Sequence, residues 1–342
     1  MNIGIVSCYS DPKHVMQRWR YDILVKYLSQ YGHSAQYYQD GKSYDLAIVP
    51  IITENIEIFR RIFSRGIPII GDITDDLLIF PYSNYTLAGQ VYYRIKFIFD
   101  GRFRCFKEML RKSRHVVAGS ECQKKRFLPY NSNASRVTDA ITEDILSFQA
   151  RYDNPGPCKI AWFGNVASMH GFRDMGNALD VLAASGEYEL VLMTPDYVQG
   201  RYLGAYPRTV HEFISRQKIP CRWVPWTYAS LLKETAACDI GIVPVDLKEP
   251  FAVAKPPGRA LLMMGMGLPV VAGPVESHVE DIQEGTTGFI ARSPQDWVRT
   301  IGQLGASAEL RRRVGLNASR FVRENFSEKM FTRRYLKVID SL

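Results

Sequence analysis

Residues 249–271 read EPFAVAKPPGRALLMMGMGLPVV, and this stretch joins a loop with two cations, an apolar helix, a tight turn and a strand. Proline suits the start of a helix because the first helical residue needs no N–H donor, so a helix is predicted over Pro257–Met264. Lys255 and Arg259 then lie around the N-terminus of that helix. The helix dipole and the two cations would together stabilise a bound diphosphate. The alternative interpretation is a buried helix whose flanking charges are merely solvated.

The residues around this stretch alternate short apolar runs with amphipathic segments. Such an alternation predicts a parallel sheet that is covered by helices on both faces. The predicted strands are Ile160–Phe163, Glu189–Met193, Cys221–Val224, Ile240–Val243 and Leu268–Val271. The predicted helices are Gly176–Ala184, Val210–Gln217, Ser230–Ala237 and Pro257–Met264. We therefore expect a Rossmann-like second half that binds ligands at the carboxyl ends of its strands.

The first half of the chain shows the same alternation. Its predicted strands are Ile3–Ser7, Leu46–Pro50, Ile67–Ile70 and His115–Ala118. A helix is predicted over Arg18–Tyr31, with Gly32 as its C-cap. We therefore expect an α/β protein with two Rossmann-like, doubly wound domains that face each other across a cleft. The predicted segments are residues 1–154, residues 155–325 and a terminal amphipathic helix in residues 326–342.

Length, charge and cysteine content narrow the class of protein. A chain of 342 residues suits two domains better than one core. The net charge of +8 favours anionic partners, namely nucleotide phosphates, acidic glycans, nucleic acid or an anionic membrane. The six cysteines form no Cys-x-x-Cys pair, so we expect reduced thiols and a cytoplasmic protein. Residues 1–6 lack the features of a signal peptide, and the apolar residues 260–273 are too short and broken to cross a membrane.

A glycine-containing turn follows the first predicted strand of the second half, in the sequence WFGN. Gly164 would let a phosphate approach bare backbone N–H groups, and Asn165 follows it directly. Single glycines are common in turns, so a purely structural turn is the alternative. The sequence lacks the Gly-x-Gly-x-x-Gly fingerprint of dinucleotide-binding proteins, which argues against a Rossmann oxidoreductase.

The stretch from Lys255 to Val271 resembles the donor site of GT-B glycosyltransferases, particularly of family 4 and its relatives. One common variant of their donor site has a Lys, three residues, a Lys or Arg, an apolar helix and a Gly-Leu-Pro-Val-Val exit. The matching residues are Lys255, Arg259, Gly267, Leu268, Pro269, Val270 and Val271. Residues 239–244 resemble the preceding strand of the family, residues 286–289 its later turn, and the segment from Phe326 its closing helix, which crosses back to the first domain. The resemblance implies the GT-B architecture.

The resemblance also implies roles at the donor site. Lys255 and Arg259 would bind the donor diphosphate. The backbone at Gly164 and Asn165 would approach the phosphates or the sugar. Thr194, after the second strand of this half, would reach the nucleotide.

The positions that would contact the base and the ribose match the family less fully. Val224 and Trp226 would flank the base, although a packing role is the alternative for Trp226. Glu249 is the candidate for a glutamate that the family often has near this loop, but its spacing differs. Leu262 stands where the family has the glutamate that holds the ribose hydroxyls. His170 stands roughly where the family has a lysine, and a surface loop position is expected for it.

Acidic and basic residues of the first half complete the set of candidates. Asp72 and Asp75 follow a predicted strand in the sequence GDITDD, in a region that faces the donor sugar or the acceptor in the resembling family. We predict hydroxyl binding or acceptor activation for them, with a metal site or helix capping as the alternatives. Arg18 and Arg20 flank Trp19 and would bind an anion in the cleft, or else they are solvated.

The expected function is transfer of a sugar from a nucleotide-sugar donor to a glycan or lipid-linked acceptor in polysaccharide or glycoconjugate biosynthesis. A UDP-sugar such as UDP-glucose is the first choice of donor and a GDP-sugar the second. The resemblance implies a retaining hexosyltransferase without a metal or a permanently bound cofactor. A nucleotide-sugar epimerase and a non-catalytic two-lobed sugar-binding or nucleotide-binding protein are the alternatives.

Partners other than the donor and acceptor follow from charge and aromatic content. The basic residues are dispersed and form no recognition module, so no nucleic-acid partner is expected. Residues 80–104 combine several aromatic residues with Arg94, Lys96, Arg102 and Arg104. This composition predicts peripheral contact with an anionic membrane at its inner, cytoplasmic face, or else an ordinary helix packed on the first domain.

Overall fold

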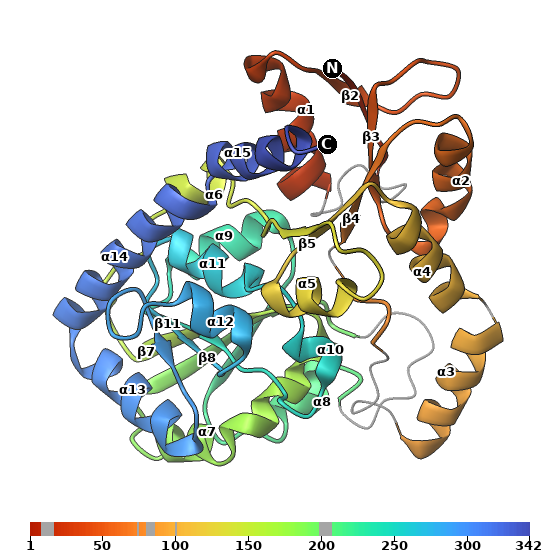
Figure 1. The fold of residues 1–342 in the computed structure, drawn as a ribbon. Helices are drawn as coiled ribbons and strands as arrows, with labels where there is room; N and C mark the ends of the chain where they lie inside the picture. Colours follow the sequence, from red (N-terminus) through yellow and green to blue (C-terminus); the bar gives the residue numbers. More distant parts are fainter. Residues whose placement is uncertain (8–16, 74, 80–85, 100, 198–206) are drawn as a thin grey trace.

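A computed structural model describes residues 1–7, 17–73, 75–79, 86–99, 101–197 and 207–342 (Figure 1). Each half of the chain forms a six-stranded sheet, and all strand pairs run parallel. The strand orders are β2-β1-β3-β4-β5-β6 and β12-β11-β10-β7-β8-β9. Parallel neighbours need crossover connections, which helices supply here. The predicted α/β fold with two doubly wound sheets is confirmed.

The first half contains six strands and the helices that cover them. Its strands are β1 (Asn2–Ile5), β2 (Ser34–Tyr37), β3 (Leu46–Pro50), β4 (Ile69–Ile73), β5 (His115–Ala118) and β6 (Ala134–Arg136). Its short helical turns are η1 (Gln17–Tyr21), η2 (Leu28–Tyr31) and η3 (Thr53–Asn55). Its α-helices are α1 (Asp22–Tyr27), α2 (Ile56–Ser64), α3 (Leu87–Phe99), α4 (Arg102–Lys112), α5 (Glu121–Phe127) and α6 (Glu143–Ser147).

The second half repeats this plan. Its strands are β7 (Cys158–Phe163), β8 (Tyr188–Thr194), β9 (Cys221–Pro225), β10 (Ile240–Val243), β11 (Val270–Ala272) and β12 (Phe289–Ile290). The helices up to the Gly-Leu-Pro turn at residues 267–269 are η4 (Val166–Met175), α7 (Ala178–Ala183), α8 (Val210–Ile214), α9 (Tyr228–Ala236), α10 (Pro250–Val253) and α11 (Gly258–Gly265). The remaining helices are α12 (Glu276–Asp281), α13 (Pro294–Ala306), α14 (Ala308–Phe326) and α15 (Glu328–Ile339).

Most predicted elements of the first half are present, but two strands were missed. The sequence of β2, SAQY, is half-buried and has no apolar run, and β6 has only three residues. The helix predicted over Arg18–Tyr31 is divided into η1, α1 and η2. Its predicted C-cap is confirmed, because Gly32 ends η2 with a φ of 81°, a left-handed conformation that glycine adopts without a steric penalty.

The Gly-Leu-Pro turn after α11 has a specific geometry. Gly267 has a φ of 84°, and its N–H donates to the Met264 carbonyl at 2.9 Å. The Leu268 N–H donates to the Met263 carbonyl at 3.0 Å, so the two bonds form a Schellman motif that closes the helix. A Cβ at Gly267 would lie 2.9 Å from the Tyr152 hydroxyl, which leaves little room for another residue. Strand β11 then begins at Val270, after Pro269.

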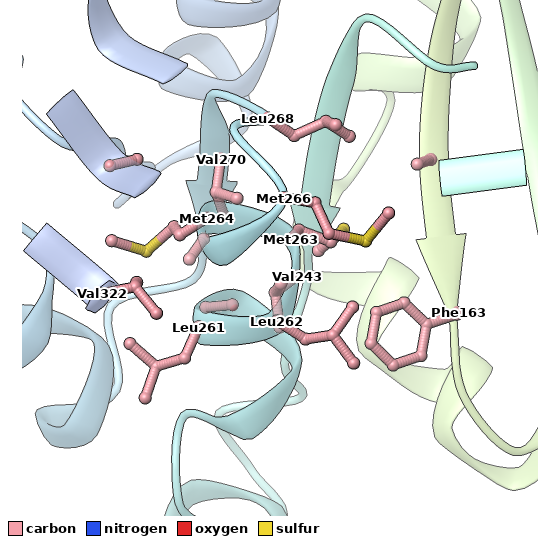
Figure 2. Packing of buried hydrophobic residues seen from close by; sticks show 14 of the residues in the cluster. Phe163, Val243, Leu261, Leu262, Met263, Met264, Met266, Leu268, Val270 and Val322 are labelled. Carbon is pink, nitrogen blue, oxygen red and sulfur yellow. The ribbon is translucent and has the colours of Figure 1, made fainter. Parts of the chain in front are cut away.

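Helix α11 is the centre of the second core. All side chains from Ala260 to Met264 are buried, and Figure 2 shows Leu261, Met264 and Val322 in one apolar cluster with β10 and β11. Helix α14 packs against α11, and α15 then packs against α1 of the first half (Figure 1). Within the described ranges of the chain, no helix is both long and apolar enough to cross a bilayer.

Candidate functional site

A cavity of about 530 Å³ lies between the two halves, where the carboxyl ends of both sheets meet. Trp19, Asp75 and Asp139 line it from the first half. The second half contributes the ends of β7 and β10, the loop before α11 and the first turn of that helix. The predicted site residues that line it are Asp75, Gly164, Asn165, Trp226, Lys255 and Arg259.

A second hollow, of about 1000 Å³, lies elsewhere on the first half. Leu46 and Ile69, the first residues of β3 and β4, line it, so it adjoins the amino ends of these strands. Doubly wound folds bind their ligands at the opposite, carboxyl ends. We therefore take the cavity between the two halves as the candidate site.

Arg259 is the most unusual charge in the cavity. Its guanidinium is half-buried, and its Nη1 lies 3.5 Å from the Phe163 carbonyl oxygen. Among the residues that the structure describes, it has no carboxylate partner. Burial lowers the pKa of Arg259 to about 10, so the group is still charged at neutral pH. A cation removed from water without a counter-ion is unfavourable, and a bound anion would compensate it.

Gly164 provides the room that this guanidinium occupies. A Cβ at residue 164 would lie 3.2 Å from Arg259 Nη1 and 3.2 Å from the Trp162 ring. Both distances are tighter than ordinary van der Waals contact. The glycine after β7 therefore keeps the space between strand end and guanidinium open, as expected for a turn that a phosphate approaches.

Two histidines near Arg259 have pKa values below the ordinary histidine value. Burial, and to a smaller extent the charge of Arg259, lowers the pKa of His278 to about 4. Its Nδ1 lies 2.9 Å from the Gly273 carbonyl, which can only accept, so the proton of the neutral ring is on Nδ1. The pKa of His170 is also lowered, mainly by burial. His170 is buried within η4 rather than placed on a surface loop, which corrects that expectation.

Lys255 links the two halves across the cavity. Its Nζ lies 3.4 Å from Asp75 Oδ1, and both side chains are about half exposed. The same ammonium lies 4.6 Å from the centre of the Phe251 ring. Beside this pair, the Ser120 hydroxyl donates to the Ala254 carbonyl at 2.7 Å. The basic loop before α11 is thus held directly against the first half.

Asp72 and Arg20 are not in the cavity, contrary to prediction. The Asp72 carboxylate is fully buried and accepts from Arg20 through both oxygens, at 2.6 and 2.9 Å. Arg20 also donates to the Tyr335 hydroxyl of α15 at 3.4 Å. Arg18 is exposed and pairs with Asp144 at 2.9 Å. The strand end therefore uses Asp72 to neutralise a buried arginine and not to face a ligand.

Asp139 is a cavity residue that the sequence analysis missed. Its Oδ1 accepts from Arg20 Nη1 at 2.5 Å, while its side chain keeps 12% of its surface exposed at the cavity. Burial raises the pKa of Asp139, Arg20 opposes that shift, and the nearby Asp72 and Asp75 add to it. Asp139 follows β6, and no pattern in the sequence indicated this short strand.

Three further candidates lie outside the cavity lining. Thr194 is fully buried, and its carbonyl accepts from the backbone N–H of Trp226 at 3.2 Å, which helps to fix the chain where Trp226 lines the cavity. Val224 is half-buried on β9 and packs against the core of α11. Glu249 is buried and caps α10 by accepting from the Phe251 N–H at 3.3 Å.

The position of Leu262 explains the missing acid on α11. Its side chain is buried and points toward Phe163 in Figure 2, within an apolar cluster. A carboxylate at this point would lose its hydration against an aromatic ring.

Asn165 is exposed, and its Oδ1 caps η4 by accepting from the Ala167 N–H at 3.1 Å. Within the described ranges, no three His, Cys, Asp or Glu side chains are grouped closely enough to hold a metal ion.

Comparison with known proteins identifies the fold. No protein-family model and no curated protein matches the sequence. Among solved structures, the Anabaena protein Alr3699/HepE in complex with UDP is similar over 100% of both chains, with 15% identity and a TM-score of 0.68. Sucrose-phosphate synthase from Thermosynechococcus elongatus matches at 14% identity and a TM-score of 0.66, covering 99% of this chain and 98% of its own.

A third solved structure, a glycosyltransferase from Rickettsia africae, matches at 14% identity and a TM-score of 0.61. It covers 98% of this chain and 97% of its own. At these identities the likeness concerns architecture, and it extends over nearly the whole of each chain. The chain therefore has the GT-B fold, with two parallel α/β sheets on either side of the cavity that Arg259 lines.

Proposed function

We propose that the protein is a glycosyltransferase that moves a sugar from a nucleotide-sugar donor to a glycan or lipid-linked acceptor. The observation that carries this proposal is Arg259, a half-buried cation in the cavity with no carboxylate partner among the described residues. A donor diphosphate supplies the anion that this guanidinium lacks. Arg is well suited to the task because its planar fork can bind two phosphate oxygens at once.

The diphosphate site combines helix termini with cations. Helix α11 begins at Gly258, and η4 begins at Val166 after the Gly164 turn, so both present N-terminal N–H groups close to the cavity lining. Lys255 adds a second cation once the phosphate displaces Asp75 from its ammonium. Such termini favour anions through their free N–H groups and the helix dipole.

A UDP-sugar is our first choice of donor, and a GDP-sugar is the second. Three of the similar solved structures are of the same Anabaena protein with UDP, with UDP-glucose, or with UDP and glucose. In this chain, Trp226 is 37% exposed at the cavity rim beside Pro195, which gives a planar base an aromatic surface to contact. Because α11 offers no acid at Leu262, ribose hydroxyls would need other partners.

The proposed reaction breaks the bond between the sugar C1 and the β-phosphate oxygen, and it forms a bond between C1 and an acceptor oxygen. The acceptor proton goes to the departing diphosphate, whose new negative charge Arg259, Lys255 and the α11 N-terminus stabilise. Asp75 and Asp139 are the carboxylates in the cavity lining, and they would accept hydrogen bonds from sugar hydroxyls. We propose retention of the anomeric configuration and no permanently bound cofactor.

Calorimetric titration with UDP, GDP and NAD tests the donor site. We expect one nucleoside diphosphate to bind wild type and to bind Arg259→Ala at least about tenfold more weakly, the loss expected for one charge-assisted hydrogen bond. Arg313→Ala, at an exposed position of α14, is the matched control and should bind like wild type. Tight NAD binding, or no nucleotide binding by a folded protein, would contradict the proposal.

Sugar transfer itself needs a second assay. With the identified nucleotide-sugar, release of the nucleoside diphosphate should depend on an added glycan or lipid-linked acceptor. Formation of an epimerised free sugar without any acceptor would instead support an epimerase.

A further inference from the structure

Helix α3 carries a continuous row of exposed apolar side chains. Leu87, Val91, Ile95 and Phe99 recur at every fourth residue, and their side chains are 81, 57, 51 and 84% exposed. Tyr92, which is 38% exposed, lies beside them. Residues four apart share one side of a helix, so these five residues form one surface, which we call the α3 stripe.

The α3 stripe is not explained by the fold or by the donor site. Helix α3 packs against α4, and in Figure 1 it lies at the outer end of that helix, away from both sheets. None of its five residues lines the cavity of the candidate site. A soluble surface usually scatters its exposed apolar residues singly, and a contiguous group bordered by polar residues marks an interaction surface.

Charges at the two edges of the stripe indicate what covers it. Residues 87–99, LAGQVYYRIKFIF, contain no Asp or Glu. Helical geometry places Arg94 next to Leu87 at one edge and Lys96 beyond Tyr92 at the other. Two more arginines, Arg102 and Arg104, follow in the first turn of α4.

An apolar row between two cationic edges fits the interface of an anionic bilayer. Such a helix lies in the plane of the membrane, with its apolar face among the upper acyl chains. Lys and Arg at its edges extend their charged ends to the lipid phosphates while their methylene groups cover apolar surface. A second copy of this chain fits less well, because both edges are cationic and any face-to-face pairing would bring like charges together.

We propose that the α3 stripe binds the protein peripherally to a bilayer that contains anionic lipids. This surface is separate from the donor cavity, so the inference does not depend on the proposed enzymatic activity. It would hold the first half of the chain, and with it the side of the cavity formed by Asp75 and Asp139, near lipid-linked substrates.

Co-sedimentation with vesicles tests this proposal without any nucleotide. Phosphatidylcholine vesicles containing phosphatidylglycerol are compared with vesicles of phosphatidylcholine alone, at low salt. We expect wild type to bind the anionic vesicles and to be released by added salt. Leu87→Ser/Ile95→Ser/Phe99→Ser should lower the partition coefficient at least about tenfold, and Lys96→Gln about fivefold or less.

A matched control replaces exposed apolar residues elsewhere. Leu128→Ser/Val181→Ser/Val279→Ser removes three such residues from other elements and should bind vesicles like wild type. Cooperative thermal unfolding of each variant establishes that it is folded. Three results would overturn the proposal: equal binding to both vesicle types, no binding by folded wild type, or a wild-type dimer in sedimentation velocity that the stripe variant abolishes.

Discussion

Lys255 Nζ lies 3.4 Å from Asp75 Oδ1, and this ion pair joins the two halves of the molecule across the cavity. The ammonium proposed to bind the donor diphosphate is therefore already paired in the unliganded protein. Binding of a nucleotide has to exchange one anion for another. The pair is about half exposed, so solvent screens it and exchanging its carboxylate for a phosphate costs little free energy.

We predict that Asp75→Asn separates nucleotide binding from turnover. Without the competing carboxylate, Lys255 is free for phosphate, and the affinity for the nucleoside diphosphate should rise by up to about fivefold. The rate of sugar transfer should fall, because the carboxylate proposed to accept from a sugar hydroxyl is lost. Calorimetry and steady-state kinetics on one preparation measure both effects. Weaker nucleotide binding by this variant would show that Asp75 orders the loop rather than competing for Lys255.

Arg259→Met should change stability and binding in opposite directions. The substitution removes a half-buried charge that has no carboxylate partner among the described residues, so the unliganded protein should gain about 1 kcal/mol. Nucleotide binding should weaken at least about tenfold, because the phosphate loses its bidentate partner. Denaturant unfolding and calorimetry give the two numbers. A variant that is destabilised and binds normally would place Arg259 in the fold instead of the site.

Much of the fold could be predicted from apolar runs that end in turn residues. Strand β10 was predicted with the correct bounds, and β8 within one residue at each end, because their cores are continuously apolar. Strands β2 and β6 were missed because each has at most four residues and no buried side chain. Tertiary pairing with β1 and β5, and not local preference, makes them strands.

Asp72→Asn tests the structural role that replaces the predicted catalytic one. Removing one partner of a fully buried pair leaves Arg20 poorly compensated, and we expect a loss of about 3–5 kcal/mol in the free energy of unfolding. Asp144→Asn is the matched control at the exposed Arg18 pair and should cost about 1 kcal/mol or less. Urea unfolding of both variants measures these two losses in the free energy of unfolding. Unchanged stability with lost activity would restore the original interpretation of Asp72.

The candidate site was only partly predictable, for a reason that Asp72 and Asp139 illustrate. Both residues are acidic; Asp72 lies in β4, one residue before its end, and Asp139 follows β6. Arg20 pairs with both, but Asp72 is fully buried, whereas part of Asp139 is exposed at the cavity. A contact between residues 20, 72 and 139 joins three separate segments. Sequence spacing carries no information about such a contact, whereas Lys255 and Arg259 share one helix terminus and could be predicted together.

Gly164→Ala should impair nucleotide binding. The added Cβ would lie 3.2 Å from Arg259 Nη1, so the guanidinium must move away from the place where the phosphate is proposed to bind. We expect about tenfold weaker binding, since a displaced arginine loses one charge-assisted hydrogen bond. Gly302→Ala is the control: its Cβ meets no atom within 4 Å, and in the middle of α13 it should stabilise by about 0.5–1 kcal/mol. Equal nucleotide affinity in the two variants would contradict the assignment of Gly164.

His278 should make the fold sensitive to mild acid. Burial lowers its folded-state pKa to about 4, below the unfolded value of about 6.5, so the unfolded chain binds an extra proton between these two pH values. Stability should therefore rise with pH from about 4 to about 6.5, by up to about 3 kcal/mol from this residue. His278→Gln keeps a polar side chain but does not titrate, so its unfolding free energy should depend less on pH in that window. Urea unfolding at several pH values measures the slope, and an identical pH dependence in the variant would mean that His278 does not titrate as its buried position requires.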